Sequence, residues 1–180
     1  MTTITFLNGD IFTPADDYEL TEDEKLQVFK AEINDEKVLS NRYWGCIHLK
    51  TLILSESVKV IGSGAFMGCV ELEGHLNLPS KLTKIGDFAF YKCSSLIGNL
   101  IIPETCRHVG TSAFNGCSGF NGFLYYPVGC LAYNQWDKNK TAGNHFLGVD
   151  NVVGLRLEDI VTLDEKIGCL IRQLVISEIE

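Results

Sequence analysis

Seven cysteines and four histidines are the side chains of this 180-residue chain that could bind a metal, form disulfides or act as nucleophiles. Structural zinc sites commonly place two cysteines a few residues apart, and the sequence contains no Cys-x-x-Cys pair. Instead, four cysteines recur every 23 or 24 residues, at Cys46, Cys69, Cys93 and Cys117. This interval indicates one position of a repeating core, in which a reduced thiol behaves as a small apolar group.

The histidines give little support for a catalytic or metal centre. Cys46-Ile47-His48 is a weak metal-ligand pattern, and each histidine is expected to be an ordinary solvated side chain. No ordered Ser/His/Asp set, Gly-rich phosphate loop or pair of carboxylates stands out. We therefore expect no catalytic residue, no metal site and no cofactor, and the chain is predicted not to be an enzyme.

The middle of the chain superposes on itself when it is shifted by 24 residues. Three successive copies share the columns Ala65, Ala89 and Ala113; Phe66, Phe90 and Phe114; Cys69, Cys93 and Cys117; Leu72, Leu96 and Phe120; and Gly74, Gly98 and Gly122. Degenerate copies flank them, one around Tyr43, Cys46 and Leu49, the other around residues 146–154. The pattern predicts a solenoid of about five coils, which bury a continuous core only when they are stacked.

The spacing within one copy predicts how each coil is built. Alternation in Leu76-Asn77-Leu78-Pro79 predicts a short strand with the two leucines inward, and His75 and Asn77 outward. Pro79 is expected to end the strand because it has no N–H to donate. Phe90, Cys93 and Leu96 lie three residues apart, which predicts a single tight helical turn. The predicted fold class is an α+β solenoid.

Residues 84–96, Lys-Ile-Gly-Asp-Phe-Ala-Phe-Tyr-Lys-Cys-Ser-Ser-Leu, resemble a unit of the BspA-like leucine-rich-repeat family. A unit of that family reads roughly Leu-x-Ile-Pro, then Val-x-x-Ile-Gly, then Ala-Phe-x-x-Cys-x-x-Leu. Gly-Cys-Ser-Gly-Phe at 116–120, followed by Gly122, looks like the Bacteroidetes-type variant. The resemblance covers about residues 38–157. It implies a right-handed leucine-rich-repeat coil and a family whose members are mostly cell-surface or secreted proteins implicated in adhesion.

Three parts are expected along the chain. Residues 1–37 form an N-terminal cap, with a hairpin turning at Asn8-Gly9 and a helix that begins at a Thr21/Glu24 capping box. That helix would place Leu26, Phe29 and Ile33 on one face. Residues 38–161 form the solenoid, with an insertion at about 133–145, and residues 162–180 form a C-terminal capping helix. Whether the terminal helices cap the core or dock a partner is left open.

The charge distribution argues against nucleic acid as a partner. The net charge of −8 is divided into −6 over residues 1–49, +1 over 50–126 and −3 over 127–180, with no basic stripe to meet a phosphate backbone. No apolar run reaches the length of a membrane span, and no signal peptide is visible. These features predict a cytoplasmic or virion protein, or a cell-surface protein whose signal has been removed.

The outward face of the predicted strand ladder is the strongest candidate for a binding surface. One outward column contains Ile53, Asn77, Ile101 and Tyr125, and the column before it contains His75 and Phe123. Exposed apolar side chains in neighbouring rungs usually mark a contact surface, unless the caps or the insertion fold over them. Trp136, in the insertion, would either extend this strip or plug the last coil.

The predicted function is therefore that of a non-enzymatic protein–protein interaction module, which presents the ladder face and the inserted loop to a protein partner. The candidate contacts are Ile53, His75, Asn77, Ile101, Phe123, Tyr125 and Trp136. The alternatives are a structural component of a phage or virus particle or of another large assembly, and a cell-surface adhesin. The sequence leaves open a homo- or hetero-oligomeric assembly.

Overall fold

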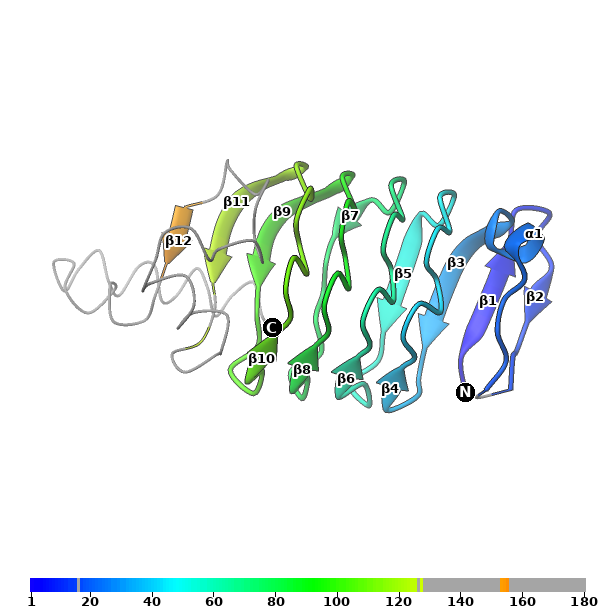
Figure 1. The fold of residues 1–180 in the computed structure, drawn as a ribbon, viewed down its shortest axis with the longest axis horizontal. Helices are drawn as coiled ribbons and strands as arrows, with labels where there is room; N and C mark the ends of the chain where they lie inside the picture. The colour runs from blue at the N-terminus through cyan, green and yellow to red at the C-terminus, as the bar shows by residue number, and fades with distance from the viewer. Residues whose placement is uncertain (16, 126, 128–152, 156–180) are drawn as a thin grey trace, which may run out of the picture.

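The structure is a computed structural model, and it describes residues 1–15, 17–125, 127 and 153–155. Four stacked coils follow a small N-terminal sheet (Figure 1). The longer strands, together with the two-residue β7, lie on one side of the stack: β3 (Val28–Ile33), β5 (Thr51–Leu54), β7 (Gly74–His75), β9 (Leu96–Ile101), β11 (Phe120–Tyr125) and β12 (Val153–Leu155). Two-residue strands form a second side: β4 (Lys37–Val38), β6 (Val60–Ile61), β8 (Lys84–Ile85) and β10 (His108–Val109). Turns without regular structure form the third side, so the predicted solenoid is confirmed.

The N-terminal hairpin is present, but the cap helix expected after it is much shorter. β1 (Thr3–Phe6) pairs antiparallel with β2 (Ile11–Phe12), and the Thr21/Glu24 capping box opens α1 (Glu22–Lys25). The prediction that the helix continues to Ile33 is wrong. β3 occupies that segment, pairing antiparallel with β1 and parallel with β5. Val28, Ala31 and Ile33 are buried there, so burial in a sheet outweighs the helical spacing of Leu26, Phe29 and Ile33.

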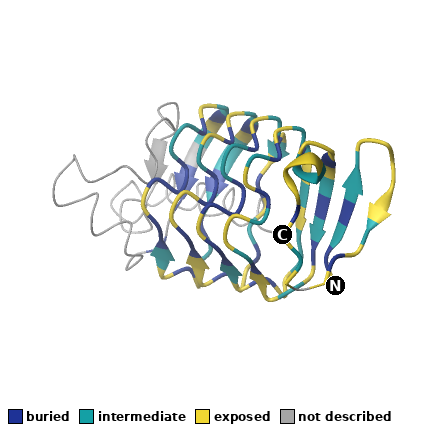
Figure 2. Cartoon of the chain, turned by 45° about the vertical axis from the view of Figure 1, so that its right-hand side comes forward, coloured by how far each residue is buried: buried dark blue, intermediate teal, exposed yellow. Residues whose placement is uncertain are grey.

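A stack of four aromatic rings fills the centre of the coils. Tyr43, Phe66, Phe90 and Phe114 are fully buried, and their neighbouring ring centroids lie 5.3, 5.2 and 5.4 Å apart with near-parallel planes. The alanine, leucine and cysteine columns of the repeat surround these rings. Figure 2 shows the buried residues on the inside of the stack and the exposed ones at its corners. The core columns predicted from the 24-residue period are confirmed.

The cysteine column bonds to the coil before it. Each of three thiols donates a hydrogen bond to the carbonyl of an aromatic core residue: Cys69 to Tyr43 at 3.2 Å, Cys93 to Phe66 at 3.1 Å and Cys117 to Phe90 at 3.0 Å. Burial raises the pKa of Cys46 and of Cys117 to about 12, and raises the pKa of Cys69 and of Cys93 well above its usual range. The five cysteines of the described residues are all free and buried.

These thiols should not react in the folded protein, because thiol reagents attack an exposed thiolate. In a variant with Cys130 and Cys169 replaced by serine, we expect Ellman's reagent at pH 8 to label none of the other five within minutes. All five should react once the protein is unfolded in guanidinium chloride. Rapid labelling of Cys69, Cys93 and Cys117 in the native state would show that this column is not buried.

The turn side is held by backbone hydrogen bonds between coils rather than by helices. Phe90 N–H donates to the Ala113 carbonyl at 2.8 Å, and Phe66 N–H donates to the Ala89 carbonyl at the same distance. Within the third coil, Cys93 N–H donates to the Phe90 carbonyl at 3.1 Å, which closes a single turn. No helix forms over residues 90–96, but this hydrogen bond between residues three apart closes the single tight turn that the spacing predicts. The N–H groups of Phe90 and Lys92 donate to carbonyls of the next coil.

Glycine is required where successive coils approach most closely. Gly62, Gly86 and Gly110 follow the short strands, and each donates its N–H to the coil before it at 2.9 Å. An added Cβ at Gly86 would lie 2.5 Å from the Ser63 nitrogen and 2.7 Å from the Gly62 carbonyl carbon. Only a residue without a side chain fits this backbone contact.

The ladder of longer strands is interrupted and offset. β3 and β5 belong to the N-terminal sheet, whereas β7, β9, β11 and β12 form a separate parallel sheet. Between β7 and β9, Gly74 lies opposite Leu96, two residues short of the partner that the 24-residue period would give. Between β9 and β11 the register shifts along β11, and Leu124 then lies opposite Leu100, as the 24-residue period requires. β12 pairs with β11 at a separation of 30 residues, six more than the repeat period. The insertion at 133–145 and the helix at 162–180 lie outside the described residues.

Candidate interaction surface

The outer face of the longer strands, here called the ladder face, presents apolar and uncharged polar side chains. Ile53 on β5 is 46% exposed, and His75 and Asn77 are also exposed, as the sequence indicates. Ile101 on β9 is half-buried. The structure adds Ile97, which is 44% exposed and lies opposite His75.

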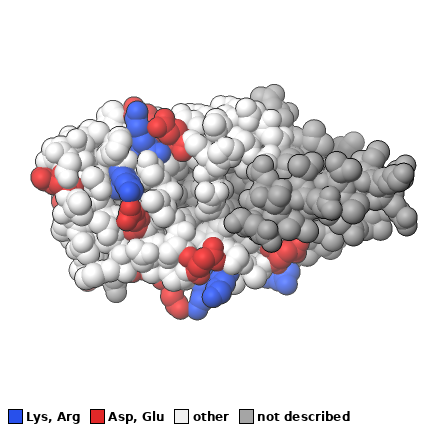
Figure 3. Space-filling view, turned by 180° about the vertical axis from the view of Figure 1, so that it is seen from behind, with Lys and Arg blue, Asp and Glu red and all other residues white. Residues whose placement is uncertain are grey.

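Very little charge lies on this face. Lys30 and Glu32, both on β3, form an ion pair with each other. Figure 3 shows the molecule from behind, with charged side chains near the upper and lower edges and at the left end of the described part, and one blue-and-red group between them. Covering a surface with few charges and exposed isoleucines costs little desolvation free energy, which suits a protein contact.

His75 is held in place by the neighbouring coil. Gly98 has a φ of 79°, and a Cβ added there would lie 2.4 Å from the His75 ring, so the imidazole covers the space that this glycine leaves. The Gly98 N–H donates to Oδ1 of Asn121 at 3.0 Å. The exposed His75 ring therefore lies over Gly98 of the next coil on the ladder face.

Tyr125 does not belong to the exposed strip, contrary to the sequence interpretation. It is 4% exposed, and its hydroxyl donates a hydrogen bond to the Glu104 carboxylate. Burial is the main cause that raises the pKa of Tyr125, and the Glu104 contact adds to it. β11 is paired on both sides, with β9 and β12, which places this residue inside the sheet. The Phe123 side chain and Trp136 lie outside the described residues.

Sequence reasoning missed Ile97 because it assumed one register along the whole strand. With a uniform shift of 24, His75 aligns with Asn99, whereas the structure pairs it with Ile97. Gly98 was the available signal, because a glycine inside a strand often marks a bulge or a bend. Ile97, the exposed isoleucine, comes directly before this glycine.

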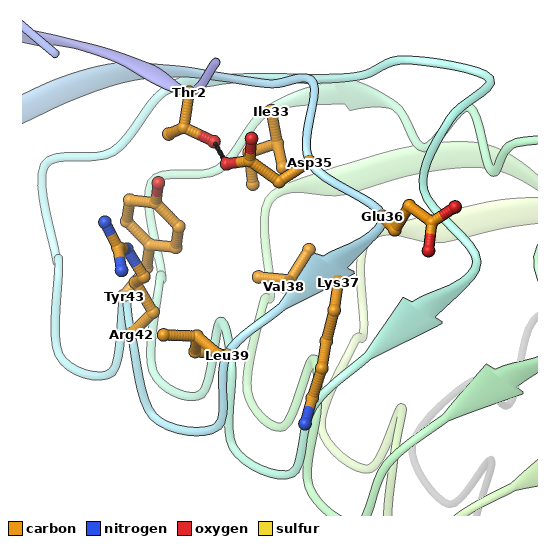
Figure 4. Close-up of a pocket in the computed structure, with 9 residues that line it drawn as sticks. All are labelled: Thr2, Ile33, Asp35, Glu36, Lys37, Val38, Leu39, Arg42 and Tyr43. Carbon is orange, nitrogen blue, oxygen red and sulfur yellow. Dashed lines mark hydrogen bonds between the residues drawn. The ribbon is translucent and has the colours of Figure 1, made fainter. Parts of the chain in front are cut away.

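A cavity of about 240 Å³ opens between the N-terminal sheet and the first coil (Figure 4). Its polar lining includes Thr2, whose hydroxyl donates to Asp35, together with Arg42 and Tyr43. The hydrogen bond from Thr2 is the main cause that lowers the pKa of Asp35, and burial raises the pKa of Tyr43 to about 12. Among the described residues, the buried Tyr43 hydroxyl has no partner in good hydrogen-bond geometry, although the nearby Arg42 side chain opposes the rise in its pKa. A polar cavity of this size can hold water that would satisfy it.

The described residues contain no group of three His, Cys, Asp or Glu side chains placed to hold a metal ion. Within that part of the chain, no helix has the length and apolar character needed to cross a bilayer.

Comparison with known proteins agrees with this architecture. A sequence profile for the BspA type leucine rich repeat region matches residues 36–126 in six copies, which is half of the chain. The chain belongs to the BspA-type leucine-rich-repeat family. Among solved structures, this BspA-type chain is similar to a leucine-rich repeat protein from Bacteroides ovatus, with 27% identity and a TM-score of 0.58. The match covers 73% of this chain and 30% of the Bacteroides ovatus chain.

A second solved structure, a leucine-rich repeat protein of T. pallidum, is 24% identical with a TM-score of 0.49. That match covers 80% of this BspA-type chain and 82% of the T. pallidum chain. No curated protein matches the sequence.

Proposed function

We propose that this BspA-type chain is a non-enzymatic protein-interaction module that contacts a partner protein through its ladder face. The observation that carries the proposal is the ladder face, which has little charge and exposes Ile53 and Ile97. Ile53 on β5 and Ile97 on β9 lie on the same side of the stack with β7 between them, and an exposed apolar patch that spans coils is typical of a contact site. Membership of a leucine-rich-repeat family, whose stacked coils create extended binding surfaces, supports the same reading.

The stacked coils would present these contacts in a fixed geometry. Paired neighbouring strands are roughly 4.8 Å apart, so side chains on successive rungs keep a set spacing. The backbone hydrogen bonds between coils hold that spacing before any partner arrives. A preorganised surface loses less conformational entropy on binding than a flexible one.

The proposed contacts are Ile53, His75, Asn77, Ile97 and Ile101, with Phe123 and Trp136 extending the same surface. Tyr125 is left out because it is buried. We keep as proposals the boundaries 1–37, 38–161 and 162–180 for the cap, the solenoid and a C-terminal helix.

Replacing Ile53 by aspartate should weaken partner binding at least tenfold, because a charge would then have to be desolvated in the contact. A partner recovered by chemical cross-linking from the source cells would be purified, and its Kd measured by calorimetry. Val60→Asp, on the short-strand side, is the matched control and should leave the Kd unchanged. Unchanged binding by Ile53→Asp, with Val60→Asp impaired, would place the contact on the other side.

The partner's nature would also separate the wider roles. A capsid or tail protein would make the chain a structural component of a phage or virus particle. A host-surface protein would make it an adhesin.

A further inference from the structure

The turn side of the solenoid carries a second apolar surface, separate from the ladder face. Trp44, Ile47, Val70 and Phe88 are 48, 37, 39 and 41% exposed. Gly45 N–H donates to the Met67 carbonyl at 2.9 Å, and Gly68 N–H donates to the Tyr91 carbonyl at 2.8 Å. These bonds place Trp44, Met67 and Tyr91 at neighbouring positions of three successive coils. We call this set, Trp44, Ile47, Met67, Val70, Phe88 and Tyr91, the turn row.

Phe88 occupies a backbone position that disfavours a large side chain. Its φ is 55°, and the equivalent residues Asn41, Gly64 and Ser112 have φ values of 57, 62 and 53°. The stack imposes this conformation, because the N–H of Phe88 donates to the Thr111 carbonyl of the next coil at 2.9 Å. Glycine and asparagine tolerate the left-handed region, whereas a bulky side chain is strained there.

Lys92 stands at a second position of the same kind. Its φ is 60°, and the other three coils have Gly45, Gly68 and Gly116 there, each with positive φ. Its ammonium lies 5.3 Å from the centre of the Tyr91 ring. Among the described residues, no carboxylate forms an ion pair with Lys92.

The third coil thus has a ring at Phe88 and a cation at Lys92, where the other three coils have glycine, serine or asparagine. The Phe88 and Tyr91 rings meet edge to face, 5.8 Å apart at 78°. Phe88 and Lys92 are both exposed, and both have a strained backbone. Packing within the folded chain therefore does not explain why these positions hold large side chains. Backbone strain of this kind tends to be kept at functional sites.

We propose that the turn row, centred on Phe88, Tyr91 and Lys92, binds a peptide segment of a partner protein that carries apolar side chains and a carboxylate. The row crosses three coils, so it offers a line of apolar contacts rather than one pocket. Exposed aromatic side chains are the usual anchors of protein contacts. The Lys92 ammonium, unpaired with acid in the described part, would select a segment with a carboxylate opposite it.

The test starts from a random-peptide phage library selected against the wild-type protein. The Kd of synthetic copies of the selected peptides would be measured by fluorescence anisotropy for wild type and for two variants, Phe88→Asn and Lys92→Gly. Each variant introduces a residue that another coil has at the equivalent position. We expect peptides with apolar and acidic residues, binding at least tenfold more weakly to both variants and more weakly at high salt. Ile53→Asp, on the ladder face, should bind them normally, so this result is independent of the proposed function. Both variants should melt within about 3 °C of wild type.

Several results would overturn the proposal. They are failure to enrich any peptide that depends on Phe88 and Lys92, selection of peptides without acidic residues, and a large fall in Tm for Phe88→Asn. A concentration-dependent dimer that both variants abolish would make a second copy of this chain the occupant. Binding to an oligosaccharide array that depends on Phe88, without peptide binding, would make the ligand a saccharide.

Discussion

Phe90→Ala should lower the free energy of unfolding by about 3–5 kcal/mol, since it removes a fully buried ring from the centre of the stack. Phe90 lies between Phe66 and Phe114, with centroid distances of 5.2 and 5.4 Å. The cavity would therefore open towards both neighbouring coils. Each coil is stabilised mainly by its neighbours, so the loss should be felt along the stack.

Equilibrium unfolding in urea, followed by circular dichroism, measures this effect. Phe88→Ala is the matched control, because it removes a ring of the same size that is 41% exposed in the same coil. We expect the control to change stability much less, by about 1 kcal/mol. A Tm for Phe90→Ala within a degree or two of wild type would mean that the aromatic column is wrongly assigned.

Gly86→Ala should destabilise the protein by about 3 kcal/mol or more, although it adds a single methyl group. That group would lie 2.5 Å from the Ser63 nitrogen and 2.7 Å from the Gly62 carbonyl carbon, and backbone atoms cannot rotate away. Relief requires the second and third coils to separate. Separation would strain the hydrogen bond from Gly86 N–H to the Ile61 carbonyl, which is 2.9 Å long.

Gly68→Ala separates this steric clash from the general cost of replacing glycine. Gly68 has a φ of 77° and no atom within 4 Å of an added Cβ, so alanine there meets only backbone strain of about 1–2 kcal/mol. Urea denaturation of the two variants should rank Gly86→Ala as the more damaging. Equal losses would mean that the coils do not approach as closely as the structure shows.

The repeating columns could be predicted from the sequence because every coil meets the same constraint. An inward position repeated in three copies, such as Phe66, Phe90 and Phe114, identifies the core without knowledge of neighbouring coils. The cap could not be predicted as well. Leu26, Phe29 and Ile33 have helical spacing, and only pairing with β1 and β5 makes that segment a strand.

The candidate surface was predicted in outline and wrongly in part. Ile53 and His75 are exposed as expected, because alternation along a strand fixes which side chains point outward, and Asn77 is exposed although β7 ends before it at His75. Tyr125 is buried through a contact with Glu104, a residue 21 positions away that no local pattern links to it. The turn row escaped notice because strain at Phe88 is visible only once its φ is known.

Photo-cross-linking tests the central claim, that this chain is a binding module working through its ladder face, most directly. Benzoylphenylalanine would be placed at Ile53 on the ladder face, at Ile97 on the same face and at Lys84 on the short-strand side. After irradiation in the source cells, each adduct would be identified by mass spectrometry. We predict the same protein adduct from positions 53 and 97 and none from position 84. Adducts from position 84 alone, with positions 53 and 97 giving none, would contradict the account.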